Sequence, residues 1–394
     1  GEQRSKIEIK KHTMSKKFFI VLGTIIIIGV GVVWWQSKMM RERPLIPEKV
    51  VKIGMIGPLT GGAAKYGVEA RNGAQLAISH LNQRQDRYRY ELISADSEAD
   101  PDVAKRKAQD LALNKEILAV VGPIISPSVI SANEVFQKEK LSAVSPSATS
   151  PKISLLGDFV FRVCPSDTYQ GKALAEFIVQ DLGFQRIAIF WDLENASYSG
   201  ELADSFSQRA EQLEATITER ISYRAGQKEF TSSLQELQAT EPEALFIPGY
   251  YTEAALIAQQ TRAMGWGIPI IGGDGFHAPD LIEIGGKAVD GVRFTSFFSA
   301  DDPASIVQDF VSAYQARYGK KPGWLAAHGY DALNVIAQAI EKEGLLRGRI
   351  QKGLSEIKEF SGVTGVISFD ENGDVIKDIL KMEVKEGEFQ VWAL

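Results

Sequence analysis

The sequence has little of what metal and redox sites require. It contains a single cysteine, Cys164, and only four histidines in 394 residues. One thiol cannot form an internal disulfide, and so few scattered ligands argue against a structural zinc site. The motifs HExxH, CxxC and GxSxG are absent, and no GxGxxG follows a predicted strand. The sequence therefore predicts neither a cofactor nor an enzymatic activity.

Positive charge is also scarce beyond the amino-terminal segment. Residues 44–394 contain 35 Lys and Arg against 47 Asp and Glu, a net charge of −12. A surface with this balance repels the phosphate backbone at long range, which argues against nucleic acid as a partner. The length and the hydrophobic content of 44% suit two or three globular domains.

One segment is strongly hydrophobic. Residues 18–35 read FFIVLGTIIIIGVGVVWW, without a charge, and lysines precede them. This run is long enough to span a bilayer, and the preceding lysines place the N-terminus in the cytoplasm. A cleaved signal would have a shorter apolar core and a small-residue site, and a lipoprotein would need a cysteine after the run. We predict a tag-like cytoplasmic terminus (1–17), a transmembrane signal anchor (18–35) and a linker (36–49), with a cleaved signal as the alternative.

From residue 50 onward, short β-rich runs alternate with amphipathic stretches. This alternation of strands and helices occurs twice, before and after residue 165, and predicts two doubly wound α/β lobes. Asp100 and Pro101 form a recognised helix start. Helices are expected at 67–83, 101–114, 127–139, 168–182, 200–214, 229–239, 252–264, 303–318, 324–343 and 349–359. Strands are expected at 51–56, 90–95, 117–122, 141–145, 186–191, 216–221, 244–248, 268–273 and 291–298, with a further β-rich stretch from 365.

The loops after the predicted strands differ in chemistry between the lobes. Open parallel sheets bind ligands at the carboxyl ends of their strands, so these loops would surround a crevice. The first-lobe loops are rich in small hydroxyl residues and glycines and lead into helices, which suits a carboxylate: 58–67, 123–128 and 146–151. The second-lobe loops supply aromatic residues and one acid, Asp274: 191–200, 248–253 and 272–277. Such a crevice suits an α-amino acid, with the carboxylate at the first wall and the ammonium at the second.

Five motifs in these loops together resemble one known family. IGPLTG, VVGPIISPS, SPSATSP, FWD with YSG, and GGDGF occur in an order and spacing similar to the leucine/isoleucine/valine-binding type of ABC-transporter substrate-binding protein. The resemblance covers about residues 50–394. It implies the type I periplasmic-binding fold, a neutral, branched-chain-like amino acid as ligand, ABC permease subunits as partners and an extracytoplasmic, periplasmic location. Members are normally freed by signal cleavage or held by a lipid, so an uncleaved anchor departs from the family.

The resemblance also assigns roles to individual residues. The ligand carboxylate would be held in the first lobe by Ser126 and Thr149 with backbone groups around Ser147 and Ala148. The ammonium would be bound in the second lobe by Tyr198, Tyr250 and Asp274, while Tyr66 would pack on the ligand. We further predict a three-segment hinge, with crossings near 162–166, 292–296 and 362–366. The corresponding lobes are 50–164 plus 296–364, and 166–293 plus 365–394.

Simpler interpretations exist for the same residues. Ser126 and Thr149 could be helix N-caps, the three tyrosines half-buried packing residues, and Asp274 a turn acid. The ligand site is favoured because all of them except Tyr66 follow directly on predicted strand ends. At the level of function, a membrane-tethered sensor with a separate signalling partner and a binding protein for urea or amides are alternatives, because a fold does not fix a function.

Overall fold

The computed structural model describes residues 49–84 and 87–392. The predicted cytoplasmic terminus and signal anchor, and the linker up to residue 48, lie outside these ranges. Within them, no helix is both long enough and apolar enough to cross a membrane. The residues from Val50 onward form one structural unit, which contains two lobes.

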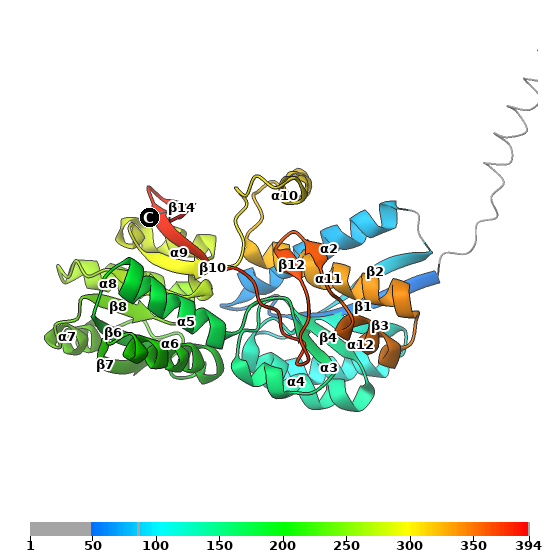
Figure 1. Ribbon diagram of the computed structural model, residues 1–394, viewed down its shortest axis with the longest axis horizontal. Helices are drawn as coiled ribbons and strands as arrows, with labels where there is room; N and C mark the ends of the chain where they lie inside the picture. Colours follow the sequence, from blue (N-terminus) through cyan, green and yellow to red (C-terminus); the bar gives the residue numbers. More distant parts are fainter. Residues whose placement is uncertain (1–48, 85–86, 393–394) are drawn as a thin grey trace, which may run out of the picture. The chain divides into compact units, whose positions relative to one another are not determined.

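The first lobe (Figure 1) is built on one sheet, which has five strands. Across the sheet the strands follow the order β2 (Tyr88–Asp96), β1 (Lys49–Gly57), β3 (Ile117–Val121), β4 (Ser142–Ser145) and β5 (Val160–Arg162). The pairs β1–β3, β3–β4 and β4–β5 are parallel. The carboxyl ends of these strands therefore meet at one edge of the sheet, where the predicted first wall begins.

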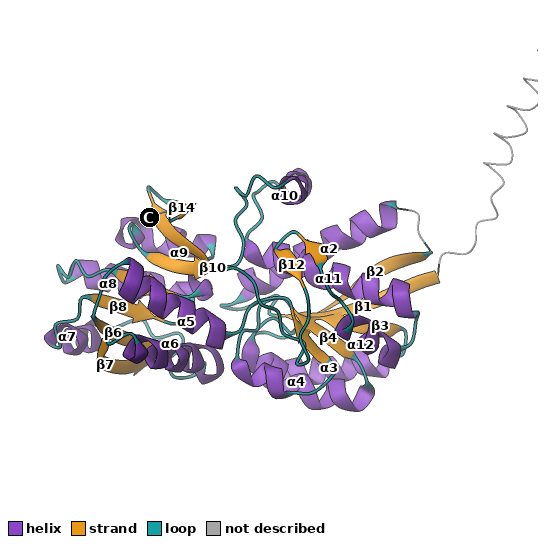
Figure 2. Ribbon diagram, viewed as in Figure 1, coloured by secondary structure: helices purple, strands orange, loops and turns teal. Residues whose placement is uncertain are grey.

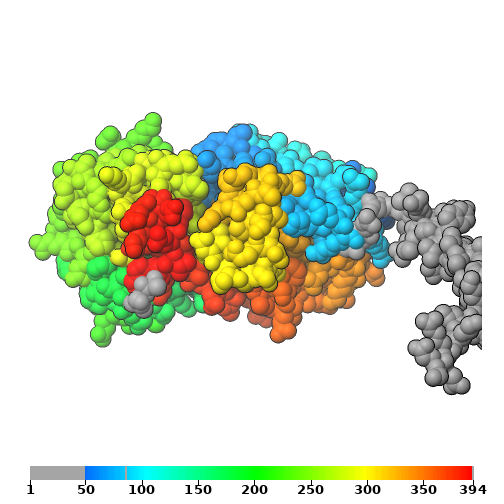
Figure 3. All heavy atoms as spheres, turned by 90° about the horizontal axis from the view of Figure 1, so that it is seen from above, coloured from blue at the N-terminus to red at the C-terminus, as the bar shows by residue number. Residues whose placement is uncertain are grey.

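Helices cover both faces of the first sheet (Figure 2). One face carries α3 (Pro101–Leu113) and α4 (Ser126–Glu139), which pack on each other. The other face carries α2 (Ala64–Gln83), α11 (Trp324–Glu343) and α12 (Arg347–Ser355). Helix α10 (Ser305–Tyr318) packs against α2 and lies at the surface of the molecule (Figure 3).

The second lobe is built on a seven-stranded sheet. Its strands follow the order β14 (Glu388–Val391), β13 (Leu380–Lys385), β10 (Arg293–Ser296), β9 (Ile270–Gly272), β8 (Ala244–Ile247), β6 (Arg186–Asp192) and β7 (Thr216–Tyr223). The strands from β7 to β10 are parallel, and the C-terminal hairpin β13–β14 is added antiparallel to β10. One face carries α5 (Asp167–Glu176) and α6 (Glu201–Gln212), and the other carries α7 (Thr231–Ala239), α8 (Tyr251–Ala263) and α9 (Pro279–Gly285). The predicted α/β fold with two parallel sheets is confirmed.

The side chains of β6 show how one strand serves both faces. Ile187 and Ile189 pack in the cluster that contains the apolar residues of α5 and α6. Ala188 and Phe190 point the other way and join the cluster that includes residues of α7 and α8. Side chains alternate across a strand, so a strand covered on both faces needs an unbroken apolar run. This is why the β6 sequence is continuously hydrophobic instead of alternating with polar residues.

Three segments of chain connect the two sheets. The first follows β5 and enters α5, and the second follows β10 and leads to α10. The third follows a small antiparallel hairpin, β11 (Phe360–Gly362) and β12 (Gly365–Ile367), and returns to β13. Sheet membership does not fix the lobe boundaries given above to the residue, so they stay a prediction.

Buried charged groups hold the third connection to α11. Asp331 accepts hydrogen bonds from the Val363 N–H at 3.0 Å and from the N–H and hydroxyl of Thr364 at 2.9 and 2.6 Å. The Thr364 hydroxyl oxygen also accepts a bond from the ammonium of Lys377. Asp331 is 1% and Lys377 7% exposed. Burial lowers the pKa of Lys377 to about 8 and raises the pKa of Asp331. The third connection is therefore fixed by a carboxylate and an ammonium that share one hydroxyl.

Helices α2 and α11 cross closely because each has a glycine at the crossing. A Cβ atom on Gly73 would lie 1.8 Å from the carbonyl oxygen of Ala326, and one on Gly329 would lie 2.2 Å from that of Ala70. Both obstacles are backbone atoms, which cannot rotate away. The packing of these helices on the first sheet therefore requires residues without a side chain at both positions.

We expect Gly73→Ala to lower the free energy of unfolding by about 1–3 kcal/mol, because the helices must separate to admit the methyl group. Alanine normally stabilises a helix relative to glycine by roughly 1 kcal/mol. A decrease in the free energy of unfolding would therefore indicate the close helix crossing, because helix propensity alone predicts an increase. Urea unfolding measures the change. Gly348→Ala in α12 is the matched control, since no atom lies within 4 Å of the added Cβ there. A Gly73→Ala protein as stable as the wild type would contradict the close crossing.

Candidate ligand-binding site

A small cavity lies between the strand ends of the two sheets. The space around it that protein atoms leave free, including the part open to solvent, is about 290 Å³. The residues that line it come from both lobes: Tyr66, Ile124, Ile125, Ser126, Ser147, Thr149, Tyr198, Tyr250, Asp274, Gly275 and Trp324. Seven of the eight predicted site residues are among them, and Ala148 is not.

The first wall is formed by the segments that follow β3 and β4. Ser126 is the first residue of α4, but its hydroxyl does not cap that helix and instead accepts a bond from the Ser150 N–H at 3.2 Å. The Ser147 hydroxyl donates to the Ile124 carbonyl at 2.6 Å. This wall thus places hydroxyl groups and the N-terminus of a helix against the cavity, an arrangement suited to an anion.

The backbone of Ala148 is hydrogen-bonded within its own loop. Its N–H donates to the hydroxyl oxygen of Ser145 at 3.1 Å, so this backbone group is already used within the protein. The N–H of the next residue, Thr149, has no acceptor in the part of the chain that the structure describes. Thr149 is therefore the better backbone donor of this loop.

The second wall contains a buried carboxyl group. Asp274 follows β9 in the short helix η4 (Asp274–Phe276) and is 4% exposed. Its Oδ1 accepts bonds from the Gln170 amide at 2.9 Å and from the Tyr198 hydroxyl at 3.1 Å. Burial raises the pKa of Asp274 to about 6, although these two hydrogen bonds act in the opposite direction. A carboxylate buried in this way is stabilised by a cation, which a ligand ammonium would supply.

Two stacked aromatic rings stand beside this acid. The rings of Tyr198 and Tyr250 are 5.2 Å apart and nearly parallel, with an angle of 13°. Burial raises the pKa of both phenols, so both remain neutral. They offer hydroxyl groups and ring faces, and ring faces attract a cation such as an ammonium.

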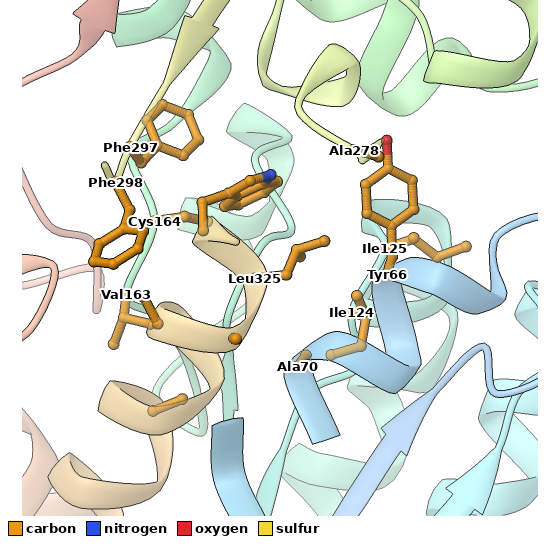
Figure 4. Packing of buried hydrophobic residues seen from close by; sticks show 14 of the residues in the cluster. Tyr66, Ala70, Ile124, Ile125, Val163, Cys164, Ala278, Phe297, Phe298 and Leu325 are labelled. Atoms are coloured by element: carbon orange, nitrogen blue, oxygen red, sulfur yellow. The ribbon is translucent and has the colours of Figure 1, made fainter. Parts of the chain in front are cut away.

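Tyr66 reaches across the cavity from the first lobe. It rises from α2, with Ile124 and Ile125 beside it, and its hydroxyl points toward the loop that contains Ala278 (Figure 4). The hydroxyl donates to the carbonyl oxygen of Gly275 at 2.6 Å. Tyr66 therefore contacts the second lobe directly as well as lining the cavity.

Further contacts join the two lobes around the cavity. The Tyr251 hydroxyl donates to the Gly62 carbonyl at 3.0 Å. Glu201 accepts a bond from the Ser150 hydroxyl and forms an ion pair with Lys152 at 2.7 Å. The two lobes therefore contact each other directly around the cavity.

Four residues that line the cavity are not among the eight predicted site residues: Ile124, Ile125, Gly275 and Trp324. Gln170, which holds Asp274 from behind, was not predicted either. Gln170 lies in the first turns of α5, where an amide side chain usually faces water, so nothing in the local sequence indicates its role. It is recognisable only because the fold brings residues 104 positions apart into contact.

Comparisons with known proteins agree with this geometry. Residues 50–388 match the model of a family described as periplasmic binding protein. The chain is 27% identical over 333 residues to the leucine-, isoleucine-, valine-, threonine- and alanine-binding protein of Pseudomonas aeruginosa, with 82% of this chain and 87% of the relative covered.

Two solved structures are similar over most of their length. A leucine-binding protein from Thermotoga maritima is 34% identical with a TM-score of 0.83, covering 87% of this chain and 98% of its own. A branched-chain amino acid transporter substrate-binding protein from Streptococcus pneumoniae, solved in complex with isoleucine, is 28% identical with the same TM-score and coverage. Because the family match spans most of the sequence, the chain belongs to the periplasmic binding protein family.

Proposed function

We propose that this protein is the extracytoplasmic substrate-binding component of an ABC importer and captures a neutral, branched-chain-like amino acid. The observation that carries the proposal is the cavity with two opposite walls, one of hydroxyl groups at a helix N-terminus and one with the buried acid Asp274. The names of the relatives, which refer to leucine, isoleucine and valine, support the same ligand class.

A zwitterion fits these walls in one orientation. The ligand carboxylate would lie near Ser126 and Thr149, and the ammonium would lie near Asp274 and the two stacked tyrosines. Tyr66, Ile125 and Trp324 leave an apolar surface for the ligand side chain.

Capture would proceed by closure of the hinge. A ligand that contacts both walls binds the closed form more tightly than the open form, so it shifts the population toward closure. A membrane permease would then recognise the closed shape. The predicted anchor at residues 18–35 would keep the protein at the membrane surface, whereas cleavage of that segment would release it into the periplasm.

Calorimetric titration tests the proposal. Protein freed of bound ligand by unfolding and refolding is titrated with the twenty amino acids, urea, acetamide and 4-methylpentanoate, which is leucine without its amine. We expect micromolar or tighter binding of a subset of neutral amino acids and none of 4-methylpentanoate. Binding of urea or acetamide alone would favour the amide alternative. If the folded protein bound none of these compounds, the proposal would be refuted. Co-purification with a kinase in place of a permease would indicate a sensor.

A further inference from the structure

A second buried acid stands behind the ammonium wall. Asp167, the first residue of α5, is completely buried, and its N–H donates to the Thr149 carbonyl at 2.8 Å. Its Oδ1 lies 3.4 Å from the Gln170 Nε2, the same nitrogen that donates to Asp274 at 2.9 Å. One amide nitrogen thus faces two carboxyl groups.

The orientation of the Gln170 amide is fixed by its other contacts. Its oxygen accepts bonds from the Asp274 N–H at 2.9 Å and from the Thr295 hydroxyl at 2.7 Å. The Asp274 N–H can only donate, so the oxygen of the Gln170 amide must face it. The NH₂ group of Gln170 must then face the two carboxyl groups. Gln170 therefore holds both the backbone and the side chain of Asp274, and Asp167 lies at its second N–H.

No protein cation neutralises this pair of acids among the described residues. The positive charge of Arg162, which is fully buried, acts to lower the pKa of Asp167. Its five N–H groups are all used at 2.7–2.9 Å by acceptors other than Asp167: Asp374 twice, the carbonyls of Thr149 and Ser150, and the Ser154 hydroxyl. Arg162 thus leaves no donor for the pair.

The remaining groups that face Asp167 supply no positive charge. Glu201 is an acid already bonded to Ser150 and Lys152. The pKa values of Tyr198, Tyr250 and Cys164 are all raised by burial, so these side chains stay neutral. The Thr149 hydroxyl is close enough to lower the pKa of Asp167, yet within residues 49–84 and 87–392 Asp167 Oδ2 has no hydrogen-bond partner.

Two carboxyl groups that share one donor and lack a cation cannot both ionise in a buried site. Burial, followed by the negative charge of Asp274, raises the pKa of Asp167 well above its ordinary value, while that of Asp274 is raised only to about 6. The hydrogen bonds point the same way: Asp274 Oδ1 accepts from Gln170 at 2.9 Å and from Tyr198 at 3.1 Å, whereas Asp167 Oδ1 has a single contact at 3.4 Å with Gln170. The negative charge is therefore better supported on Asp274, and the proton belongs on Asp167.

We propose that Asp167 is a neutral, proton-bearing positioning residue of the ammonium site, which holds Gln170 and through it Asp274, so that the pair presents a single negative charge to the ligand. This deepens the proposed function and rests on it: one charge matches the one ammonium of a neutral amino acid. Asp167 lies outside the lining of the cavity and acts through Gln170.

Leucine titration of full-length variants tests the role of the proton. Asp167→Ala removes the group that faces the second Gln170 N–H and should weaken leucine binding about tenfold. Asp167→Asn is as neutral as the protonated acid and should restore most of the lost affinity. Leucine affinity of the wild type should also fall below pH 6, as Asp274 is protonated, with the same midpoint in Asp167→Asn. If Asp167→Asn bound leucine as weakly as Asp167→Ala, the proposal would be overturned. It would also be overturned if the affinity of Asp167→Asn fell at a lower pH than that of the wild type, because this would mean that the substitution had removed a negative charge beside Asp274.

Infrared spectroscopy of the ligand-free protein gives an answer that does not depend on leucine. At pH 7 we expect the C=O band of a neutral carboxylic acid in the wild type, its loss in Asp167→Asn and its retention in Asp274→Asn. Absence of the band in the wild type would refute a protonated Asp167. If leucine fails to bind the wild type, the proposed function fails while the band still decides where the proton resides. Melting curves confirm that each variant is folded.

Discussion

Replacing Asp274 with alanine is expected to weaken leucine binding by about 2–5 kcal/mol, roughly 30-fold to several thousand-fold in Kd. The ligand ammonium would lose its buried partner and would remain desolvated in a closed cavity beside two neutral phenols. Isothermal titration calorimetry at pH 7.5, where Asp274 of the free protein is ionised, measures the change.

Asp192 provides a matched control for this experiment. It is also a buried acid of the second lobe, the last residue of β6, and burial likewise raises its pKa to about 6. Its Oδ1 accepts a local bond from the Glu194 N–H at 3.0 Å, and it does not line the cavity. Asp192→Ala should change stability more than leucine affinity. Wild-type affinity in Asp274→Ala would mean that the ammonium does not face this wall.

Replacing Asp331 with alanine is expected to lower the free energy of unfolding by about 3–5 kcal/mol. Two backbone N–H groups at residues 363 and 364 would lose their acceptor, and the buried ammonium of Lys377 would lose the negative charge that favours it. Urea unfolding at pH 7 measures the loss. Asp301→Ala is a suitable control, because that side chain is 69% exposed and its ion pair with Lys321 lies at the surface.

A second substitution separates the charge from the hydrogen bonds. Adding Lys377→Met to Asp331→Ala should recover part of the stability, since no unpaired charge is then buried. The pH dependence supplies a sign test. The pKa of Lys377 is about 8 when folded against a reference of 10.5, so the unfolded state binds more protons between these values and stability rises with pH in that window. Lys377→Met should abolish this rise. A double variant less stable than Asp331→Ala would contradict the account.

The fold could be predicted because its strands and helices differ in hydrophobic period. Asp100 accepts from the N–H groups of residues 102 and 103, and Pro101 opens α3, so the predicted helix start is confirmed. The helix expected at 168–182 instead stops at Glu176 and continues as a π-helical turn to Asp181, because apolar spacing does not distinguish these two windings. The short strand β5 was not predicted, since three residues are too few to show a period.

The site was less accessible to sequence reasoning. Residues directly after strands could be proposed because the edge of a parallel sheet collects them, and Ser126 and Asp274 do line one cavity. The sequence could not show which backbone N–H groups are free to bind a ligand. The N–H of Ala148, for example, donates to the Ser145 hydroxyl oxygen, and this contact exists only in the folded loop. Gln170 and Asp167 act through contacts with the distant Asp274, and such partners leave no local pattern.

The contacts between the lobes that involve Tyr66, Tyr251 and Glu201 need no ligand atoms. An empty protein with these contacts closes for part of the time, and each 1.4 kcal/mol of added contact energy raises the ratio of closed to open molecules tenfold. For an importer this sets a trade-off. Stronger contacts would lower the ligand concentration needed for capture, but they would also raise the share of empty molecules in the closed shape that a permease would recognise.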